Sequence, residues 1–357
     1  MYFCGMKKCI CNYLSFVQTL LLFTCLLMAC ASCSHAQICG CTDPAASNYD
    51  PKANTNDGSC KYAPAKIRAT EIGKLDTLVN GSSSLFYWNN AYWTYNDHTD
   101  RCLYKIDSTN ATTLDTLFVK RIRNRDTEDI AQDEQYLFFG DVGNNGGHRK
   151  NLNILRISKE SLLGKAPKID TIRFSYEDQT DFTASSRTTD FDCEAFIVTD
   201  DSVYLFTKQW TSLQTTVYSL PKTPGTHIAH RRETYDVKGL ITGATYMPDY
   251  HLIALCGYDY DKDHILSSLH PFIVLLYDFQ DGFFFSGNKR RLDFPSGVKA
   301  QTEAIATSNA LDYYLTCEHF HASYMGFTFD SPAQLWRVDL RKYLMPYING
   351  KSDNNIK

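Results

Sequence analysis

Three glutamates in this sequence occupy the same place in a repeated pattern. Glu128, Glu194 and Glu303 each precede a short apolar run, which is followed by a polar turn and then by an aromatic-rich run. Carboxylates that recur in this way can bind a cation through their oxygens, or can act as a general acid and a general base. Either use requires elements that bring residues far apart in the chain to one place.

The sequence around these glutamates is typical of short strands. After Glu194 the strands "EAFIV", "VYLFTK", "TTVYSLP" and "RRETYDV" follow in order, and the copies that begin at Glu128 and Glu303 repeat this order, the last one without its fourth strand. Two weaker copies begin near Ser84 and Leu240. Repeated units of four antiparallel strands predict an all-β fold, a five-bladed β-propeller.

The strand that the fifth unit lacks is expected from the other end of the chain. "KLDTLVN", which begins at Lys74, is similar to the fourth strands "TLDTLFVK" and "KIDTIRFS". We therefore predict that this segment closes the ring. A six-bladed ring with one unrecognised blade is the main alternative, and a β-sandwich is the other.

The propeller geometry places the glutamates at one mouth of the central channel. The first two strands of each unit form the hairpin nearest the axis, so the start of the first strand and the end of the second lie at the same mouth. The glutamates take the first place, and four charged residues take or adjoin the second: Asp97, Asp141, Lys208 and Glu318. The three glutamates are thus the candidate catalytic residues, and Asp97, Asp141 and Glu318 are the candidate metal ligands.

Three interpretations of this convergence remain open. The glutamates could brace the blades by accepting backbone N–H groups or by pairing locally, as Glu194 with Lys208. They could instead hold a cation, for which calcium is the candidate cofactor. In the third interpretation, crowding raises the pKa of some carboxyls, so that one stays protonated while another is ionised, as hydrolysis of a glycosidic or phosphoester bond requires.

The function predicted from these residues is that of a ligand- or partner-binding scaffold with an acidic, calcium-competent channel mouth. A secreted hydrolase of the glycosidase or phosphoesterase class is the alternative. The ligand could be a small molecule, a glycan or a protein. A nucleic-acid partner is not expected, because the net charge is −4 and no basic surface is indicated.

The N-terminus predicts export. Residues 1–36 contain two lysines, a long apolar run and the small residues of "SHAQ", as in a secretory signal peptide. In a second interpretation, a cut before Cys30 leaves an acylated cysteine, and this lipid anchor is the membrane attachment that we expect if there is one. In a third, the apolar run is not cleaved and anchors the protein in the membrane. The predicted location is periplasmic, cell-surface or extracellular.

A small module is expected between the signal peptide and the propeller. Residues 37–64 are rich in Asp, Asn, Pro and Gly and offer little to bury, so we predict that a Cys41–Cys60 disulfide stabilises them. The propeller is expected to span 65–345, and a polar tail to span 346–357.

Two resemblances support this organisation. The module is similar to "GCTDPxAxNYDPxAxxDDGSC", which recurs in secreted proteins of certain Gram-negative bacteria. "RDTEDIAQDEQYLFFGDVGNNGGHR", "DFDCEAFI" and "GLITGATY" resemble an uncharacterised family of secreted bacterial β-propellers with a DxEDIA…GDxGNNxGxR blade signature. The second resemblance covers most of residues 75–340 and implies the fold and export, but no particular activity.

Overall fold

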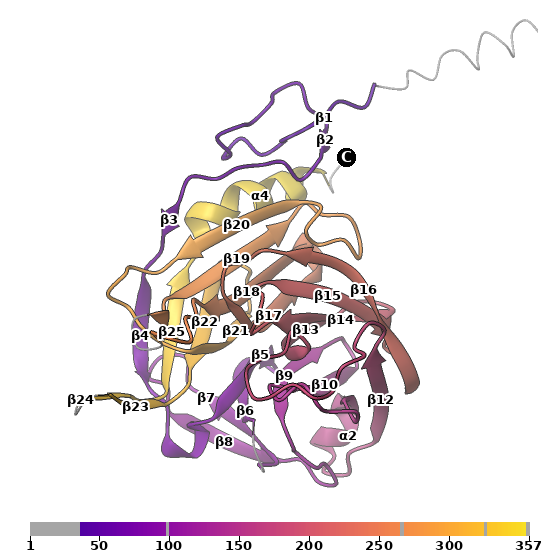
Figure 1. Cartoon of the computed structure of the whole chain (residues 1–357), viewed down its shortest axis with the longest axis vertical. Coiled ribbons are helices and arrows are strands. Elements are labelled where there is room, and N and C mark those ends of the chain that lie inside the picture. The colour runs from indigo at the N-terminus through magenta and orange to yellow at the C-terminus, as the bar shows by residue number, and fades with distance from the viewer. Residues whose placement is uncertain (1–35, 98–99, 265–267, 325–326, 355–357) are drawn as a thin grey trace, which may run out of the picture.

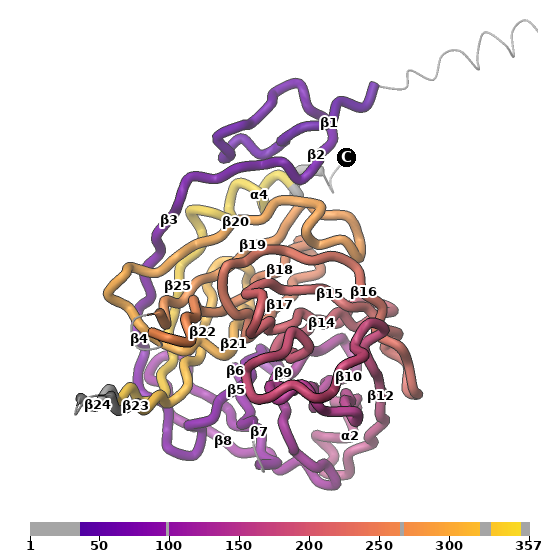
Figure 2. Tube along the Cα trace, viewed as in Figure 1, coloured from indigo at the N-terminus to yellow at the C-terminus, as the bar shows by residue number. Residues whose placement is uncertain are grey.

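The computed structural model describes residues 36–97, 100–264, 268–324 and 327–354. The predicted signal peptide, with Cys30, lies outside the described residues except for its last position. Within the described ranges, no helix has both the length and the apolar composition needed to cross a membrane. Figure 1 shows sheets arranged around a common centre, and Figure 2 shows the path of the chain from one sheet to the next.

The sheets are five blades of antiparallel strands. Blade 1 consists of β5 (Ser82–Trp88), β6 (Ala91–Asn96), β7 (Cys102–Ile106) and β8 (Thr113–Phe118). Blade 2 consists of β9 (Thr127–Gln132), β10 (Tyr136–Asp141), β11 (Asn153–Ser158) and β12 (Ile169–Tyr176). Blade 3 consists of β13 (Asp192–Val198), β14 (Ser202–Lys208), β15 (Thr215–Pro221) and β16 (Gly225–Tyr235). Blade 4 consists of β17 (Leu240–Met247), β18 (Leu252–Tyr258), β19 (Pro271–Tyr277) and β20 (Asn288–Asp293).

Blade 5 is shared between the two ends of the chain. It consists of β21 (Thr302–Thr307), β22 (Asp312–Cys317), β25 (Gln334–Asp339) and β4 (Ala69–Lys74), with the hairpin of β23 (Phe320–Tyr324) and β24 (Phe327–Ser331) inserted before β25. The innermost strands contact one another in turn, and β21 contacts β5. The ring therefore closes with five blades, which confirms the five-bladed prediction over the six-bladed alternative.

The closing strand is not the segment predicted. Ala69–Lys74 pairs antiparallel with β25, whereas the predicted "KLDTLVN" begins only at the last residue of that strand. Asp76 instead accepts a hydrogen bond from the Thr113 N–H at 2.8 Å, and η1 (Thr77–Val79) carries the chain toward blade 1. The similarity to the other fourth strands correctly indicated that the closing strand comes from the N-terminal side of blade 1. It placed that strand about one strand length too far along the chain.

One apolar layer lies between each pair of neighbouring blades. For example, Phe196 of blade 3 packs with Phe138 of blade 2, and Ile305 of blade 5 packs with Leu275 of blade 4. Both faces of an inner strand are therefore buried, as in β21, all of whose residues are buried. This burial explains the nearly continuous apolar runs of the sequence.

The outer strands of three blades are paired along their outer edges. β12 of blade 2 pairs with β16 of blade 3 in parallel, and β3 (Ala65–Lys66) pairs in parallel with β20 of blade 4. Backbone groups that an open edge would expose are thereby paired. Blades 2 and 3 consequently form one continuous eight-stranded sheet.

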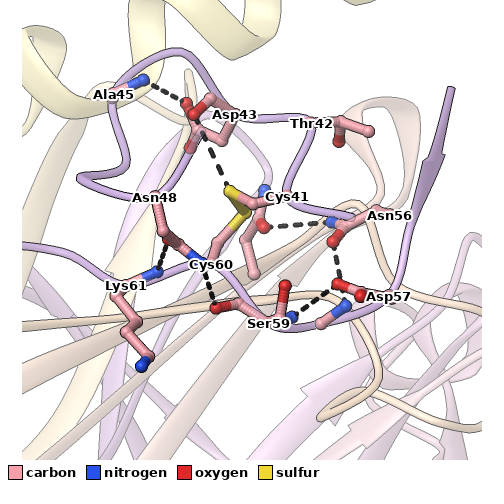
Figure 3. The surroundings of a disulfide bond; sticks show 12 residues. Cys41, Thr42, Asp43, Ala45, Asn48, Asn56, Asp57, Ser59, Cys60 and Lys61 are labelled. Carbon is pink, nitrogen blue, oxygen red and sulfur yellow. Dashed lines mark hydrogen bonds between the residues drawn. A yellow bond between two sulfur atoms is a disulfide. The ribbon is translucent and has the colours of Figure 1, made fainter. Parts of the chain in front are cut away.

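The N-terminal module is folded against blade 4. The predicted Cys41–Cys60 disulfide is present, and β1 (Cys39–Gly40) pairs with β2 (Thr55–Asn56) beside it (Figure 3). Asp43 accepts hydrogen bonds from the hydroxyls of Tyr62 and Tyr277 at 2.6 and 2.8 Å, and Lys289 Nζ donates to the Gly58 carbonyl at 3.0 Å. The module is thus joined to the propeller by polar contacts as well as by the chain.

The C-terminal segment contains a helix where a polar tail was predicted. α4 (Arg341–Asn354) packs Leu344 and Ile348 into the apolar layer of blades 4 and 5, and the Tyr347 hydroxyl donates to the Tyr250 carbonyl at 2.9 Å. The apolar positions repeat at helical spacing over too short a stretch for the sequence to reveal them. Figure 1 shows α4 between blade 4 and the N-terminal module.

Candidate functional site

Each blade contains one extra residue at the same place in its innermost strand. In all five hairpins the pairing register shifts by one residue near the start of that strand, as in a β-bulge. The residues left without a cross-strand partner are Ser83, Glu128, Glu194, Thr242 and Glu303. A bulge re-aims a side chain, so the three repeated glutamates are the bulge residues of blades 2, 3 and 5.

The other two bulge residues join neighbouring blades. The Ser83 hydroxyl donates to the Thr127 carbonyl of blade 2 at 2.8 Å, and the Thr242 hydroxyl donates to the Thr302 carbonyl of blade 5. In both cases the acceptor belongs to the residue just before a bulge glutamate. The five positions therefore divide into two that connect blades and three that carry a carboxylate.

The mouth of the channel is a cavity of about 210 Å³. We call this cavity the mouth throughout. Its lining includes six carboxylates: Asp97, Asp126, Glu128, Glu194, Glu303 and Glu318. Two cations, Lys208 and Arg187, and the aromatic rings of Trp210 and Tyr258 also line it. The structure thus brings together five of the six predicted acidic residues, and the roles assigned to them remain predictions.

Asp141 does not line the mouth. It pairs with Thr127, which precedes the bulge of blade 2. The residues that line the cavity from the second strand of the other blades lie one position further along: Asp97, Lys208, Tyr258 and Glu318. Successive side chains on a strand point to opposite faces, so Asp141 points elsewhere, and it binds Arg149 at 2.6 Å and Asn153 at 2.8 Å.

Asp126 is the lining carboxylate that the sequence reasoning missed. It lies two residues before the bulge of blade 2, outside the strand pattern. A Cβ atom on Gly143 would fall 2.3 Å from Glu128 Oε1 and 2.4 Å from Asp126 Oδ2. A side chain at this position would displace these two carboxylates, so the first glycine of "GNNGG" was the available signal.

Lys208 forms a buried ion pair in the mouth. Its Nζ atom lies 2.5 Å from Glu194 Oε2, 4.7 Å from the ring centroid of Trp210 and 5.5 Å from that of Tyr258. Burial lowers the pKa of the Lys208 ammonium, but the charges of Glu194 and its neighbours more than offset this and raise the pKa overall. The predicted local pair of Glu194 with Lys208 is therefore present.

Glu303 and Glu128 have no such partner. Neither carboxylate forms a hydrogen bond or ion pair with another described residue, although Glu303 is only 9% exposed. Burial raises the pKa of Glu303 well above its ordinary value, and the charge of Lys208 only partly offsets this. Burial and the neighbouring Glu194 and Asp126 likewise raise the pKa of Glu128.

Bracing between blades is performed by two aspartates beside these glutamates. Asp129 of blade 2 accepts a hydrogen bond from the Phe196 N–H of blade 3 at 3.2 Å, and burial raises the pKa of Asp129 to about 8. Asp192 of blade 3 accepts from the Asn144 N–H of blade 2 at 2.6 Å and from Trp210 Nε1 at 2.8 Å. The backbone bonds that were expected for the glutamates thus go to their neighbours.

Calcium remains a prediction. Carboxylates are suitable ligands for this ion. Over the described ranges, however, no three side chains of His, Cys, Asp or Glu are grouped as a metal site. The carboxylates of the mouth are distributed around the cavity, with the Lys208 ammonium among them.

Comparisons with known proteins give only structural likenesses at low sequence identity. No protein-family model matches the chain. The search of curated proteins also gives no match. Among solved structures, glutaminyl cyclase of Myxococcus xanthus is 12% identical, with 78% of this chain and 100% of that chain covered and a TM-score of 0.42.

The PQQ-bound aldose sugar dehydrogenase of Streptomyces coelicolor is 9% identical, with coverages of 77% and 99% and a TM-score of 0.43. Hydrazine synthase of Kuenenia stuttgartiensis is 10% identical, with coverages of 68% and 78% and a TM-score of 0.36. At these TM-scores the likenesses carry no argument about function, and the fold assignment rests on the sheet order.

Proposed function

We propose that this protein is an exported β-propeller that binds a small, positively charged ligand in the mouth of its channel. The observation that carries this proposal is the state of Glu303, a carboxylate that is nine-tenths buried, lines the cavity and has no partner among the described residues. A buried carboxyl without a partner is costly in a scaffold that has no use for it.

The charge balance of the mouth favours a cation. Six carboxylates and two cations line one cavity; Lys208 is already engaged by Glu194, and the Arg149 guanidinium lies 3.7 Å from Asp126. Low-dielectric walls strengthen the attraction of such a site for positive charge. A cationic ligand would compensate Glu303 and Glu128, whose pKa values burial raises, and would favour their ionised forms.

The size of the mouth limits the ligand to a small molecule. A volume of about 210 Å³ lies below the range of drug-sized sites. The Lys208 ammonium, held between a carboxylate and two aromatic rings, is an internal example of how this mouth accommodates an alkylammonium group. An organic ammonium ion is therefore our first candidate, and calcium is the second.

Calorimetric titration of the purified protein tests this proposal. The probes are isoamylamine and calcium chloride, and the variants are Glu303→Gln and Glu128→Gln, with Glu160→Gln on the exposed face of α2 (Lys159–Leu163) as the matched control. We expect one amine per chain, with an affinity that falls about tenfold or more in the mouth variants and stays unchanged in the control. If neither cation binds, or if all variants bind with equal affinity, the proposal is refuted.

A hydrolase is the second candidate, because one pair of carboxyls is close together. Glu128 and Asp126 both lie against Gly143, and the pKa of Glu128 is raised, so that one carboxyl could donate a proton while another accepts one. A screen of glycoside and phosphoester substrates tests this candidate. Turnover that is lost in Glu128→Gln and retained in Glu160→Gln would favour hydrolysis over binding alone.

A further inference from the structure

The charges of the mouth are segregated between two sides of the ring. Blades 5, 1 and 2 are consecutive, because β21 contacts β5 and β5 contacts β9. They supply five of the lining carboxylates, which we call the acidic arc: Glu303, Glu318, Asp97, Asp126 and Glu128. The sixth, Glu194 of blade 3, is paired with Lys208, and within the acidic arc Asp126 is paired with Arg149 at 3.7 Å.

The opposite side of the mouth is cationic and aromatic. Lys208 ends β14 of blade 3, and Trp210 lies in the loop between β14 and β15. Tyr258 belongs to blade 4, and Arg187 lies in the loop that leads into blade 3. Between the two cations that line the cavity, Lys208 is buried and satisfied by Glu194. Arg187 is exposed and forms no ion pair with another described residue.

Arg187 is held in place by its backbone and by stacking. Its φ angle is 60°, in the left-handed region, and its N–H donates to the Asn145 carbonyl at 2.8 Å. Its guanidinium lies 5.3 Å from the ring centroid of Trp210, whose Nε1 is fixed by Asp192. This backbone conformation, the hydrogen bond and the stacking together hold the guanidinium beside the mouth.

From this segregation we infer that the ligand of the mouth is a small zwitterion of the free amino-acid type, whose ammonium faces the acidic arc and whose carboxylate pairs with Arg187. This inference rests on the proposed function and specifies its ligand. The unpartnered, nine-tenths buried carboxylate of Glu303 is where the ligand ammonium would be compensated. A guanidinium is the side chain best suited to bind a carboxylate with two parallel hydrogen bonds.

Matched probes separate this inference from the proposed function. A panel of free L-amino acids is first screened by thermal shift. The strongest binder is then titrated beside its two truncated relatives. For leucine, these are isoamylamine, which lacks the carboxylate, and 4-methylpentanoate, which lacks the ammonium group. The amine reports on the acidic arc alone, and the difference between amino acid and amine reports on the carboxylate contact.

We expect the amino acid to bind about tenfold more tightly than the amine or better, and the carboxylate-only probe to bind far more weakly than either. In Arg187→Gln the amino acid should bind only as tightly as the amine, while affinity for the amine is unchanged. Arg121→Gln is the matched control, because Arg121 is also exposed with a left-handed backbone (φ 68°) and does not line the mouth.

Three results would overturn parts of this account, and they differ. Equal affinities for amino acid and amine, with no special effect of Arg187→Gln, would refute the zwitterion and leave the cationic ligand standing. Tighter binding of the carboxylate-only probe would refute both, because it would assign the site to anions. Binding that Arg121→Gln weakens as much as Arg187→Gln would also refute the zwitterion, since the effect would then be one of general charge.

Discussion

Glu128 and Asp129 are adjacent in the sequence, yet they belong to two regions that differ in chemistry. Glu128 occupies the bulge of blade 2 and lines the mouth without a partner among the described residues. Asp129 lies one residue deeper, where the Phe196 N–H of blade 3 binds it. Glu128 is half-buried and Asp129 is buried, and burial raises the pKa of both, so a raised pKa alone does not distinguish a structural carboxyl from a candidate functional one. Backbone donors do.

The same contrast recurs in blade 3 and is sharper there. Asp192 receives the Asn144 N–H and the Trp210 indole, while Glu194 in the bulge two residues later is compensated by an ammonium. We therefore expect substitutions of the two backbone-bonded aspartates, Asp129 and Asp192, to affect the free energy of unfolding. Substitutions of Glu128 and Glu303 should instead affect ligand binding.

Asp129→Leu should have the largest effect on stability. The Phe196 and Ile130 N–H groups would lose their acceptor in a buried place, and each unsatisfied donor costs about 1–3 kcal/mol. We expect the free energy of unfolding to fall by about 4 kcal/mol in urea denaturation. Asp129→Asn, which keeps an acceptor oxygen, is the control and should lose much less; an equal loss would mean that the bonds are not what matters.

Lys208→Met should have the second largest effect. Burial raises the pKa of Glu194 to about 8 even beside Lys208, so without the ammonium this carboxyl either stays charged and uncompensated or takes up a proton. Removal of one partner of a buried pair costs about 3 kcal/mol. The double variant Lys208→Met/Glu194→Gln should recover a large part of this loss. Urea denaturation at pH 8 measures it, and strictly additive losses would argue against the pair as a coupled unit.

The free energy of unfolding should depend on pH through the titration of Asp129. Burial raises the pKa of Asp129 from 3.8 to about 8, so between these pH values the folded protein keeps a proton that the unfolded chain releases. The contribution of Asp129 to stability is therefore highest below pH 4 and falls as pH rises to 8. Glu128 and Glu303 act in the same direction.

We expect a slope for Asp129 of about 1 kcal/mol per pH unit between pH 5 and 7. Denaturant unfolding at several pH values checks this slope, and Asp129→Asn should make it shallower without removing the part due to the mouth glutamates. A slope that Asp129→Asn leaves unchanged would show that this carboxyl is ionised in the folded protein.

Glu303→Gln should have the smallest effect on stability and thus mark the boundary between the two regions. No hydrogen bond with a described residue is lost, and one source of repulsion in the acidic arc is removed, so we expect a change of under about 1 kcal/mol, in either direction. Thermal unfolding in the absence of ligand measures it. If the free energy of unfolding falls as much as we expect for Asp129→Leu, Glu303 braces the blades as Asp129 does.

The sequence predicted the repeat with good accuracy because it depends on local patterns. Apolar runs of strand length and polar turns follow from burial of both faces of each inner strand, as in β13, all of whose residues are buried. The segment that closes the ring was displaced by several residues, since Ala69–Lys74 is half exposed and its pairing depends on β25. The helix α4 was missed for a similar reason: its stabilising contacts lie in blades 4 and 5.

Residues 128, 194 and 303 stood out in the sequence as one recurring position, because each lies near the start of a strand that every unit repeats. The fold alone decided which of their neighbours join them. One bulged residue per blade sets the phase of every later side chain, so a shift of a single position sends Asp141 to Arg149 and leaves Asp97 and Glu318 at the mouth. That phase arises from pairing between strands, a contact that no local pattern encodes.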